Sequence, residues 1–285
     1  MHSKPQTEQD RSGMSEVAFD AFARALEKNS GIVLEKRKQY LIASRLSRLL
    51  ARYEVSDFDQ LASLFIANPK SALGQAVLDA MTTNETFWFR DSVPFSMLRQ
   101  IILERLSESS GQAIRVWSAA CSTGQEPLSM AMLVDELERS NPYAMRAGVQ
   151  ILATDISRNA IEHCVRAEYD KLSVVRGLSE ERLARYFDTG SEGIWRVSPR
   201  LRSRVEYRVF NLLDSYALLG RFDVIFCRNV LIYFSAEMKV EVLKRLHGCL
   251  RTGGYLILGA SETLNDLPTM YQMRSFQPGI AYQAR

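Results

Sequence analysis

The sequence predicts an α/β protein: a doubly wound parallel sheet that follows an all-helical region and contains a small antiparallel insert. Three observations support this fold class. From residue 113 onward, β-rich runs alternate with helical patterns, as is typical of a parallel sheet with helices on both faces. Residues 16 to 81 show only helical periodicity. The segment 186 to 210 has turn residues between β-rich runs, which is the pattern of a hairpin.

The N-terminal region begins with a tail that we expect to be disordered, residues 1 to 15. A first helix is predicted from residue 16 to Gly31. Its apolar residues fall close to one helical stripe: Val17, Phe19, Phe22, Ala25 and Leu26.

The next helical segment, within residues 36 to 53, has one apolar and one strongly basic side. The apolar side consists of Leu41, Ile42, Leu46, Leu49 and Leu50. The segment has no acidic residue but six basic ones: Lys36, Arg37, Lys38, Arg45, Arg48 and Arg52. This concentration of charge favours a docking surface for an acidic partner. The alternative is a solvated helix face whose arginines lie over apolar neighbours.

Five strands and three intervening helices are predicted after residue 112. The strands are expected at 113 to 120, 148 to 156, 204 to 212, 221 to 227 and 253 to 260. The helices are expected at about 125 to 139, 157 to 167 and 236 to 250. Doubly wound sheets bind ligands beyond the carboxyl ends of their strands, where the strand order reverses. Polar residues directly after strands are therefore the first candidates for a site.

The loop after the first strand has the strand, turn and helix geometry of a nucleotide-binding loop. It holds a single glycine, Gly124, matches neither glycine-rich phosphate motif, and has Glu126 where a phosphate would be repelled. A carboxylate there fits a ligand that has no phosphate and carries positive charge. S-adenosylmethionine, with its sulfonium and ammonium groups, has both properties. Alternatively, Glu126 complements the dipole of its own helix.

Other polar residues follow the remaining strands. Asp155 comes after the second strand, 31 residues beyond Gly124, and an acid at this position suits ribose hydroxyls. The alternative is that it caps the next helix. Asn211 follows the third strand, and the fourth is followed by Arg228, Asn229 and then Tyr233. We expect these side chains to converge on one rim of the sheet.

Five longer motifs follow one another along the chain: NETFWFR, AACSTGQEPLSMA, ATDIS, FNLL and FDVIFCRNVLIYF. In type and order they resemble the motifs of the CheR family of chemotaxis receptor glutamate O-methyltransferases, from about residue 16 onward. The resemblance implies a receptor-docking helical domain over 16 to 81 and a linker over 82 to 95 that contributes to the cofactor site. It implies a Rossmann-like methyltransferase domain over 96 to 285, with a small antiparallel β-subdomain inserted at about 170 to 208.

The resemblance also implies roles for single residues. It implies that nine contact the cofactor: Asn84, Thr86, Arg90, Glu126, Asp155, Asn211, Leu212, Arg228 and Asn229. It assigns catalytic roles to Arg90 and Tyr233, for which the alternatives are an interdomain salt bridge and a core tyrosine. Receptor docking is implied for Arg45, Arg48 and Arg52, although Arg52 is displaced by one place from the family pattern.

The implied reaction makes modest demands on side chains. A glutamate carboxylate, with an ordinary pKa near ~4.3, is already ionised and nucleophilic at neutral pH. It needs no general base, so the lack of a Ser/His/Asp constellation does not argue against this reaction. Arg90 can present a two-donor fork to the carboxylate, and Tyr233 a phenolic donor. Both would orient the reacting groups.

Composition narrows the cofactors, partners and location. The four cysteines show no C-x-x-C spacing, so neither zinc nor a disulfide framework is predicted, and a reducing cytoplasm fits best. No apolar run approaches the ~18 residues of a membrane span, and the net charge of +3 is mild for a nucleic-acid binder. We therefore expect no metal, no nucleic-acid partner and no membrane insertion. The expected cofactor remains S-adenosylmethionine, and a monomer is expected. The resemblance implies the cytoplasmic helical domain of methyl-accepting chemoreceptors as the partner.

One subgroup of the family uses the β-subdomain to bind a pentapeptide at the receptor's C-terminus, and it tends to have a longer loop in this hairpin. Here only DTGSEG separates Phe187 from Ile194. The sequence therefore predicts a protein that does not depend on the pentapeptide.

Two other functions are compatible with a fold of this class. A nucleic-acid methyltransferase would share the fold, but the D/N-P-P-Y/F segment of adenine enzymes and the Pro-Cys nucleophile of cytosine enzymes are both missing. A catalytically silent module that senses the cofactor or scaffolds receptors is the other alternative. The presence of Arg90, Glu126, Asp155 and Tyr233 argues against it.

Overall fold

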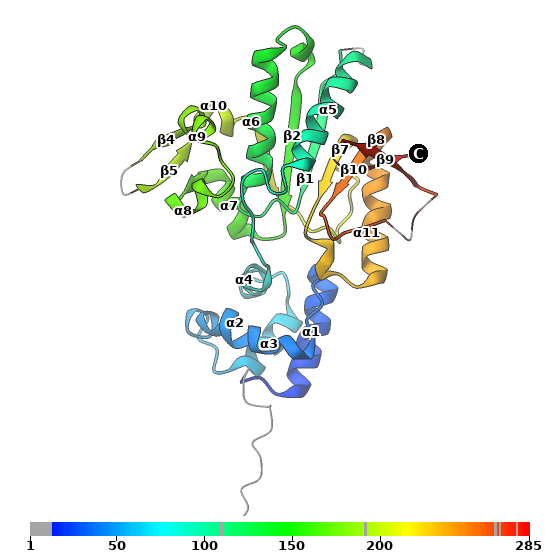
Figure 1. The fold of residues 1–285 in the computed structure, drawn as a ribbon. Helices are drawn as coiled ribbons and strands as arrows, with labels where there is room; N and C mark the ends of the chain where they lie inside the picture. The colour runs from blue at the N-terminus through cyan, green and yellow to red at the C-terminus, as the bar shows by residue number, and fades with distance from the viewer. Residues whose placement is uncertain (1–12, 109–110, 191–192, 265–266, 268, 278) are drawn as a thin grey trace, which may run out of the picture. The chain divides into compact units, whose positions relative to one another are not determined.

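The computed structural model in Figure 1 describes residues 13–108, 111–190, 193–264, 267, 269–277 and 279–285. The chain forms two compact units. The helical unit consists of Met1–Thr83 and Tyr233–Met238, and the sheet unit consists of Asn84–Ile232 and Lys239–Arg285. The tail expected to be disordered, 1 to 15, lies outside the described residues except for its last three positions. There Met14 is buried and Ser15 caps the first helix.

The described part of the helical unit has four α-helices and a short 3-10 helix. They are α1 (Glu16–Ser30), η2 (Lys36–Lys38), α2 (Tyr40–Arg52), α3 (Phe58–Ala67) and α4 (Ala72–Met81). The helix N-termini of α1, α3 and α4 are capped by Ser15, Asp57 and Ser71, which satisfy exposed backbone amides. Helix α1 packs against α3, and α2 packs against α4. This confirms the predicted all-helical region.

One residue of the predicted apolar stripe of α1 does not face the core. Phe19, Phe22 and Leu26 are buried, whereas Val17 is 82% exposed. Two residues along an α-helix correspond to a rotation of about 200°. Val17 therefore lies on the side of the helix opposite Phe19, and its placement in the buried stripe was wrong.

The sheet unit is built on a seven-stranded sheet with the order β6-β2-β1-β7-β8-β10-β9. The strands are β1 (Ile114–Ala119), β2 (Val149–Asp155), β6 (Val205–Val209), β7 (Phe222–Cys227), β8 (Leu250–Leu258), β9 (Tyr271–Phe276) and β10 (Gly279–Ala284). The pairings from β6 to β8 are parallel, which confirms the doubly wound sheet of five predicted strands. Strands β9 and β10 were not predicted, and they add an antiparallel edge.

Helices flank this sheet, as the alternating pattern predicted. They are α5 (Val93–Glu108), α6 (Gln125–Ser140), α7 (Arg158–Arg166) and α11 (Ala236–Cys249). Three short helices, α8 (Lys171–Val175), α9 (Glu180–Tyr186) and α10 (Pro199–Arg202), lie in the segment between α7 and β6. Two 3-10 helices, η3 (Ala144–Ala147) and η5 (Leu231–Tyr233), complete the described helices. Helix α6 packs against β2 and β6, and α5 packs against α6 and β10.

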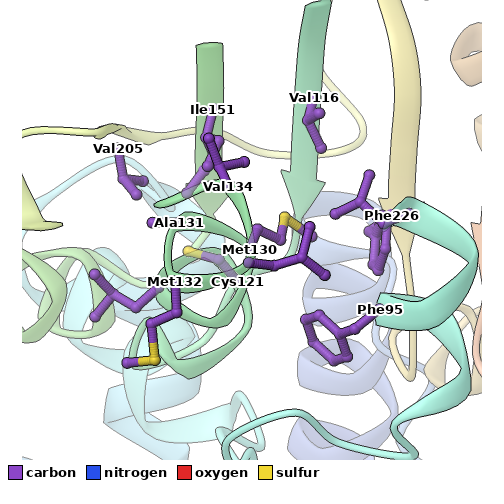
Figure 2. Packing of buried hydrophobic residues seen from close by; sticks show 14 of the residues in the cluster. Phe95, Val116, Cys121, Met130, Ala131, Met132, Val134, Ile151, Val205 and Phe226 are labelled. Carbon is purple, nitrogen blue, oxygen red and sulfur yellow. The ribbon is translucent and has the colours of Figure 1, made fainter. Parts of the chain in front are cut away.

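The central strand β1 is covered on both faces. On one face, Val116 belongs to a buried cluster with Met130 of α6, Phe95 of α5 and Phe226 of β7 (Figure 2). On the other face, the Trp117 ring lies 5.3 Å from the Phe222 ring and 5.5 Å from the Tyr216 ring. Side chains alternate between the faces of a strand, so a strand buried on both sides reads as an apolar run. This explains why β1 was readily predicted.

A second sheet is small and antiparallel, with the order β3-β5-β4. It consists of β3 (Glu168–Tyr169), β4 (Phe187–Thr189) and β5 (Trp195–Val197). We call the segment from β3 to α10 the insert; the strand that follows, β6, pairs with β2 in the large sheet. Asp135 of α6 holds the insert, because its buried carboxylate lies 3.0 Å from Arg200 and 3.4 Å from Arg204. The presence of a small antiparallel insert is confirmed, whereas the end of the predicted hairpin segment, 186 to 210, forms β6 of the large sheet.

All four cysteines are free and buried. Within the described ranges, no group of three or more His, Cys, Asp or Glu side chains is arranged to hold a metal ion. The helices of the described chain are too short or too polar to cross a membrane.

Candidate cofactor-binding site

The order of the large sheet reverses between β1 and β7. From β1 the chain passes to β2 and β6 on one side, and then to β7 and β8 on the other. Strands β1 and β7 are parallel neighbours, and Ala119 is paired with Cys227 at their carboxyl ends. Ligands of such sheets bind at this switch point. The loops after these two strands therefore meet where a ligand is expected.

The loop after β1 turns sharply. Ala120 (φ 65°), Ser122 (φ 52°) and Gly124 (φ 95°) all have left-handed backbone conformations. A Cβ added to Gly124 would lie only 3.0 Å from the Cys164 sulfur, so the turn requires glycine there. Left-handed conformations at non-glycine residues are unfavourable and concentrate at functional sites. Here they bring the loop back over the end of the sheet.

Glu126 and Arg228 form a buried ion pair across the switch point. Glu126 is 9% exposed, and its two oxygens accept hydrogen bonds from Ser118 Oγ and Arg228 Nη1, each at 2.8 Å. Arg228 is 5% exposed, and its Nη2 donates to Asp91 Oδ2 at 2.6 Å and to the Arg90 carbonyl at 3.0 Å. Glu126 therefore does more than complement the dipole of α6. A carboxylate has about four acceptor positions, so Glu126 keeps capacity for a cationic ligand.

Asp155 lies at the carboxyl end of β2, the strand next to β1. Its oxygens accept hydrogen bonds from the backbone amides of Ser122 at 2.8 Å and Ser157 at 2.9 Å. The side chain that caps α7 is that of Ser157, which accepts from the amide of Ala160. The alternative that Asp155 caps this helix is therefore wrong. The two amides fix the direction of the Asp155 carboxylate.

The linker places several predicted residues beside this rim. The carbonyl of Asn84 accepts a hydrogen bond from Ser122 Oγ at 3.0 Å. The guanidinium of Arg90 donates to the Glu85 carbonyl at 3.1 Å and lies 5.5 Å from the Phe87 ring. Thr86, between them, is partly exposed. The fold brings five predicted residues into one hydrogen-bonded region: Asn84, Arg90, Glu126, Asp155 and Arg228.

The predicted residues after β6 are held separately by their own turn. Asn211 Oδ1 accepts from the amide of Leu213 at 3.0 Å. The side chain of Leu212 is buried, and its carbonyl accepts from the Tyr216 hydroxyl at 2.9 Å. No hydrogen bond between described residues joins this turn directly to Glu126 or Arg228.

Asn229 follows Arg228 in a left-handed conformation, with φ 58°. A buried carboxylate holds it there: Glu262 accepts from the amides of Asn229 at 2.7 Å, Val230 at 3.1 Å and Gly259 at 2.8 Å. Sequence reasoning missed Glu262. The signal was present, because Glu262 follows the end of the fifth predicted strand, just as the other candidates follow the first four. Ser118, Ser122 and Asp91 were missed as well. Ser122 and Asp91 bind partners distant in sequence, whereas Ser118 binds the nearby Glu126.

The remaining candidates lie in the helical unit. Tyr233 belongs to this unit, where its carbonyl accepts from the amide of Val33 at 2.9 Å. Its side chain is partly exposed, so it is not a core tyrosine. Arg45 donates to the carbonyls of Met81 and Thr82, at 2.6 and 3.1 Å. Arg48 and Arg52 are exposed.

The thiols near the rim are not prepared to act as nucleophiles. Burial raises the pKa of Cys121, which lies in the loop after β1, well above its ordinary value. Burial also raises the pKa of Cys227, at the end of β7. Both thiols therefore stay protonated at neutral pH. A methyltransferase that attacks through a cysteine thiolate is not supported here.

These features agree with the cofactor inferred from the sequence. An acid ends β2, a second carboxylate follows β1, and the loop after β1 matches neither glycine-rich phosphate motif. Carboxylate oxygens are suitable partners for ribose hydroxyls and for an ammonium group. The fold and the rim define the chain as a Rossmann-like methyltransferase that uses S-adenosylmethionine.

Comparison with known proteins specifies the family. Residues 84–280 match the family model described as "CheR methyltransferase, SAM binding domain", and residues 18–82 match "CheR methyltransferase, all-alpha domain". The chain belongs to the CheR methyltransferase family, as its motifs indicated.

Curated relatives are similar over nearly the whole chain. "Chemotaxis protein methyltransferase Cher2" of Pseudomonas putida is 53% identical over 268 residues, which are 94% of this chain and 98% of the relative. "Chemotaxis protein methyltransferase 1" of Pseudomonas aeruginosa is 53% identical and covers 94% and 97%. "Chemotaxis protein methyltransferase" of Escherichia coli is 33% identical and covers 93% and 91%.

Proposed function

We propose that this protein transfers the methyl group of S-adenosylmethionine to glutamate side chains of chemoreceptors. The products are glutamate 5-O-methyl esters, which serve adaptation in chemotaxis-type signalling, and S-adenosylhomocysteine. The observation that carries the proposal is the arrangement of charged side chains at the carboxyl ends of β1 and β7. There the buried Glu126–Arg228 pair joins Arg90 to the switch point of a methyltransferase of the CheR family.

The chemistry requires alignment more than acid or base. The cofactor supplies an electrophilic methyl group on its sulfonium. A new bond joins the glutamate oxygen to the methyl carbon, while the carbon–sulfur bond breaks and leaves its electron pair on sulfur. No proton moves in this step. The protein must therefore hold carboxylate, methyl and sulfur in line and exclude water.

Three rim residues are assigned to cofactor binding with distinct tasks. Asp155 accepts from the ribose hydroxyls, since two backbone amides already fix its carboxylate. Glu126 faces the positive charge of the methionyl part. Arg228 limits the negative charge of this region by pairing with Glu126 and Asp91. Asn84, Thr86, Arg90, Asn211, Leu212 and Asn229 complete the proposed cofactor contacts.

Arg90 and Tyr233 are assigned to the acceptor glutamate. The planar guanidinium of Arg90 can orient a carboxylate through two hydrogen bonds, and Tyr233 offers a phenolic donor. Too strong a grip on the carboxylate would stabilise the ground state and slow its attack. We therefore assign both residues an orienting role.

For receptor docking, the three proposed arginines of α2 separate into two kinds. The guanidinium of Arg45 already holds the end of α4, through two carbonyls and the Thr83 hydroxyl. Arg48 and Arg52 are exposed, and they remain the better candidates for contact with an acidic receptor surface. We also propose that the protein acts as a cytoplasmic monomer, without a metal and without the receptor pentapeptide.

The pentapeptide proposal has its own test. In the insert, β4 and β5 pair from Phe187 with Val197 to Thr189 with Trp195, so the connection between them is short. Titration of the isolated pentapeptide by calorimetry is expected to give no saturable binding. Saturable binding in the micromolar range would show that the insert can hold the peptide by strand addition.

The proposed reaction is tested with radiolabelled methyl groups. The purified protein is incubated with labelled S-adenosylmethionine and a panel of receptor cytoplasmic fragments. Base-labile label on receptor protein is the expected result. Label on RNA or DNA would favour a nucleic-acid methyltransferase. Binding of S-adenosylhomocysteine without transfer to any receptor would favour a silent cofactor-sensing module.

A further inference from the structure

The insert contacts each of the three aromatic residues that precede Arg90. Phe87 lies 4.4 Å below the guanidinium of Arg176, measured from Cζ to the ring centre. Trp88 lies edge-on to the rings of Tyr169 and Phe187, at 4.9 and 5.3 Å. The guanidinium of Arg182 lies 3.8 Å from the Phe89 ring. The linker is therefore packed onto the insert directly before it reaches the rim.

The backbone fixes the position of Arg176 relative to this linker. The amide of Trp88 donates to the Arg176 carbonyl at 3.2 Å, and Trp88 Nε1 donates to the Ser173 carbonyl at 3.0 Å. Gly177 has φ 99°, and a Cβ there would lie 2.0 Å from the Trp88 carbonyl oxygen. Only glycine allows the backbone at Gly177 to approach the linker backbone so closely.

The side chain of Arg176 contacts the two residues that hold Arg90, through the Glu85 carboxylate and the Phe87 ring. Arg176 Nη2 lies 3.0 Å from Glu85 Oε1, and its guanidinium stacks on Phe87. The Arg90 guanidinium in turn donates to the carbonyl of Glu85 and lies over the ring of Phe87. Among the described residues, Arg90 has no acidic partner within salt-bridge distance. The direction of its guanidinium therefore depends on Glu85 and Phe87.

We propose that Arg176 is a positioning residue for Arg90, and that the insert uses it to set the direction of the Arg90 guanidinium at the rim. Arg176 acts through Glu85 and Phe87 and touches neither substrate. The other side of Arg90 is fixed independently, because its carbonyl accepts from Arg228. This inference rests on the proposed role of Arg90 in orienting the reacting groups.

The test is a double-mutant cycle with Arg176→Ala and Arg90→Ala, measured as kcat and KM for methylation of a receptor fragment. Loss of an exposed ion pair and a cation–π contact predicts a fall in kcat/KM of about fivefold for Arg176→Ala. The fall is expected mainly in kcat, because alignment is lost while docking is not. In the Arg90→Ala background, Arg176→Ala should have no further effect.

Two further variants distinguish positioning from a general loss of structure. Arg185→Ala is the matched control, because Arg185 also lies in the insert and makes a 2.9 Å ion pair, with Glu181. It should keep the wild-type kcat. Arg176→Lys keeps the charge next to Glu85 but loses the planar stacking, so it should restore kcat only in part.

The inference is overturned if Arg176→Ala and Arg90→Ala act additively, or if Arg185→Ala lowers kcat as much as Arg176→Ala does. The cycle is also run on affinity for S-adenosylhomocysteine, which needs no receptor. If no receptor is methylated, the proposed function fails, and the inference is then judged on this affinity alone. Additive changes, or none, in affinity would overturn it.

Discussion

The rim of the sheet unit and helix α2 of the helical unit are both rich in charge, but they hold it differently. On the rim, Arg228 and Glu126 have side chains only 2% and 11% exposed, and they bond to each other and to the chain. On α2, Arg48 and Arg52 are exposed, and only Arg45 is bound internally.

The difference separates two uses of charge. A buried pair loses its hydration and must be satisfied by the protein, so it specifies geometry and is costly to break. An exposed charge acts over a distance, is screened by salt and contributes little to stability. The comparison therefore predicts large, salt-independent effects at the rim and small, salt-dependent effects on α2.

The largest effect is expected for Arg228→Leu. This change leaves Glu126 buried without its cation and frees Asp91, and breaking a buried pair costs about 3 to 5 kcal/mol. Urea denaturation should show a fall of that size in the free energy of unfolding. Arg208→Leu is the control, since the Arg208 ion pair with Glu206 is exposed. Equal stability of the two variants would break the comparison.

A second large effect is expected for Asp155→Ala on cofactor affinity. Two charge-assisted hydrogen bonds to ribose, each contributing about 1.5 kcal/mol or more, predict a loss of at least ~100-fold. Calorimetric titration of S-adenosylhomocysteine measures it. Because Asp155 also accepts from Ser122 and Ser157, the variant should melt at a lower temperature as well. Unchanged affinity would remove Asp155 from the site, and Asp188→Ala, in the insert, should leave affinity unaltered.

A moderate effect is expected for Glu262→Gln. The carboxamide turns an NH₂ group toward backbone amides that are themselves donors, so at least one buried amide loses its acceptor, at about 1 to 3 kcal/mol. The loop of Arg228 and Asn229 should loosen, and affinity for S-adenosylhomocysteine should fall together with stability. A variant that loses stability but keeps full affinity would limit Glu262 to a role in folding.

The smallest effect is expected on α2. Reversing Arg48 and Arg52 to Glu should lower receptor methylation several-fold at low salt and flatten its salt dependence, because exposed charges steer association. Cofactor affinity should not change. Arg45→Ala should instead lower the melting temperature, since it removes a donor from two backbone carbonyls. Equal methylation by wild type and the double variant at low salt would show that the basic face of α2 is only solvated and does not dock the receptor.

The sequence predicted features that follow from burial and missed features that depend on contacts between distant residues. Strands such as β1 and β7 were predictable because burial on both faces leaves long apolar runs. Strand β9 was not, because four of its six residues are exposed and it lies at the sheet edge. Strand β6 was predicted although it lies at the sheet edge and three of its five residues are exposed. Rim positions such as Asp155 and Arg228 followed from strand ends alone.

Other features depend on pairings that a linear pattern does not contain. Arg45 lies on α2 close to Arg48 and Arg52, and the sequence does not distinguish it from them. Only its hydrogen bonds to two carbonyls at the end of α4 show that its guanidinium is bound within the helical unit. Glu262 lies 34 residues beyond Arg228, so its contact with the Arg228–Asn229 loop could not be read from neighbouring positions. The contact between Arg176 and Glu85 is longer-range still.

The proposed transfer of a methyl group to receptor glutamates is tested by tandem mass spectrometry of a receptor fragment after incubation with the protein and S-adenosylmethionine. We expect the added mass of one methylene on glutamate residues, removed by mild base and absent after Asp155→Ala at limiting cofactor. A base-stable methyl group on lysine, or on any side chain other than glutamate, would contradict it.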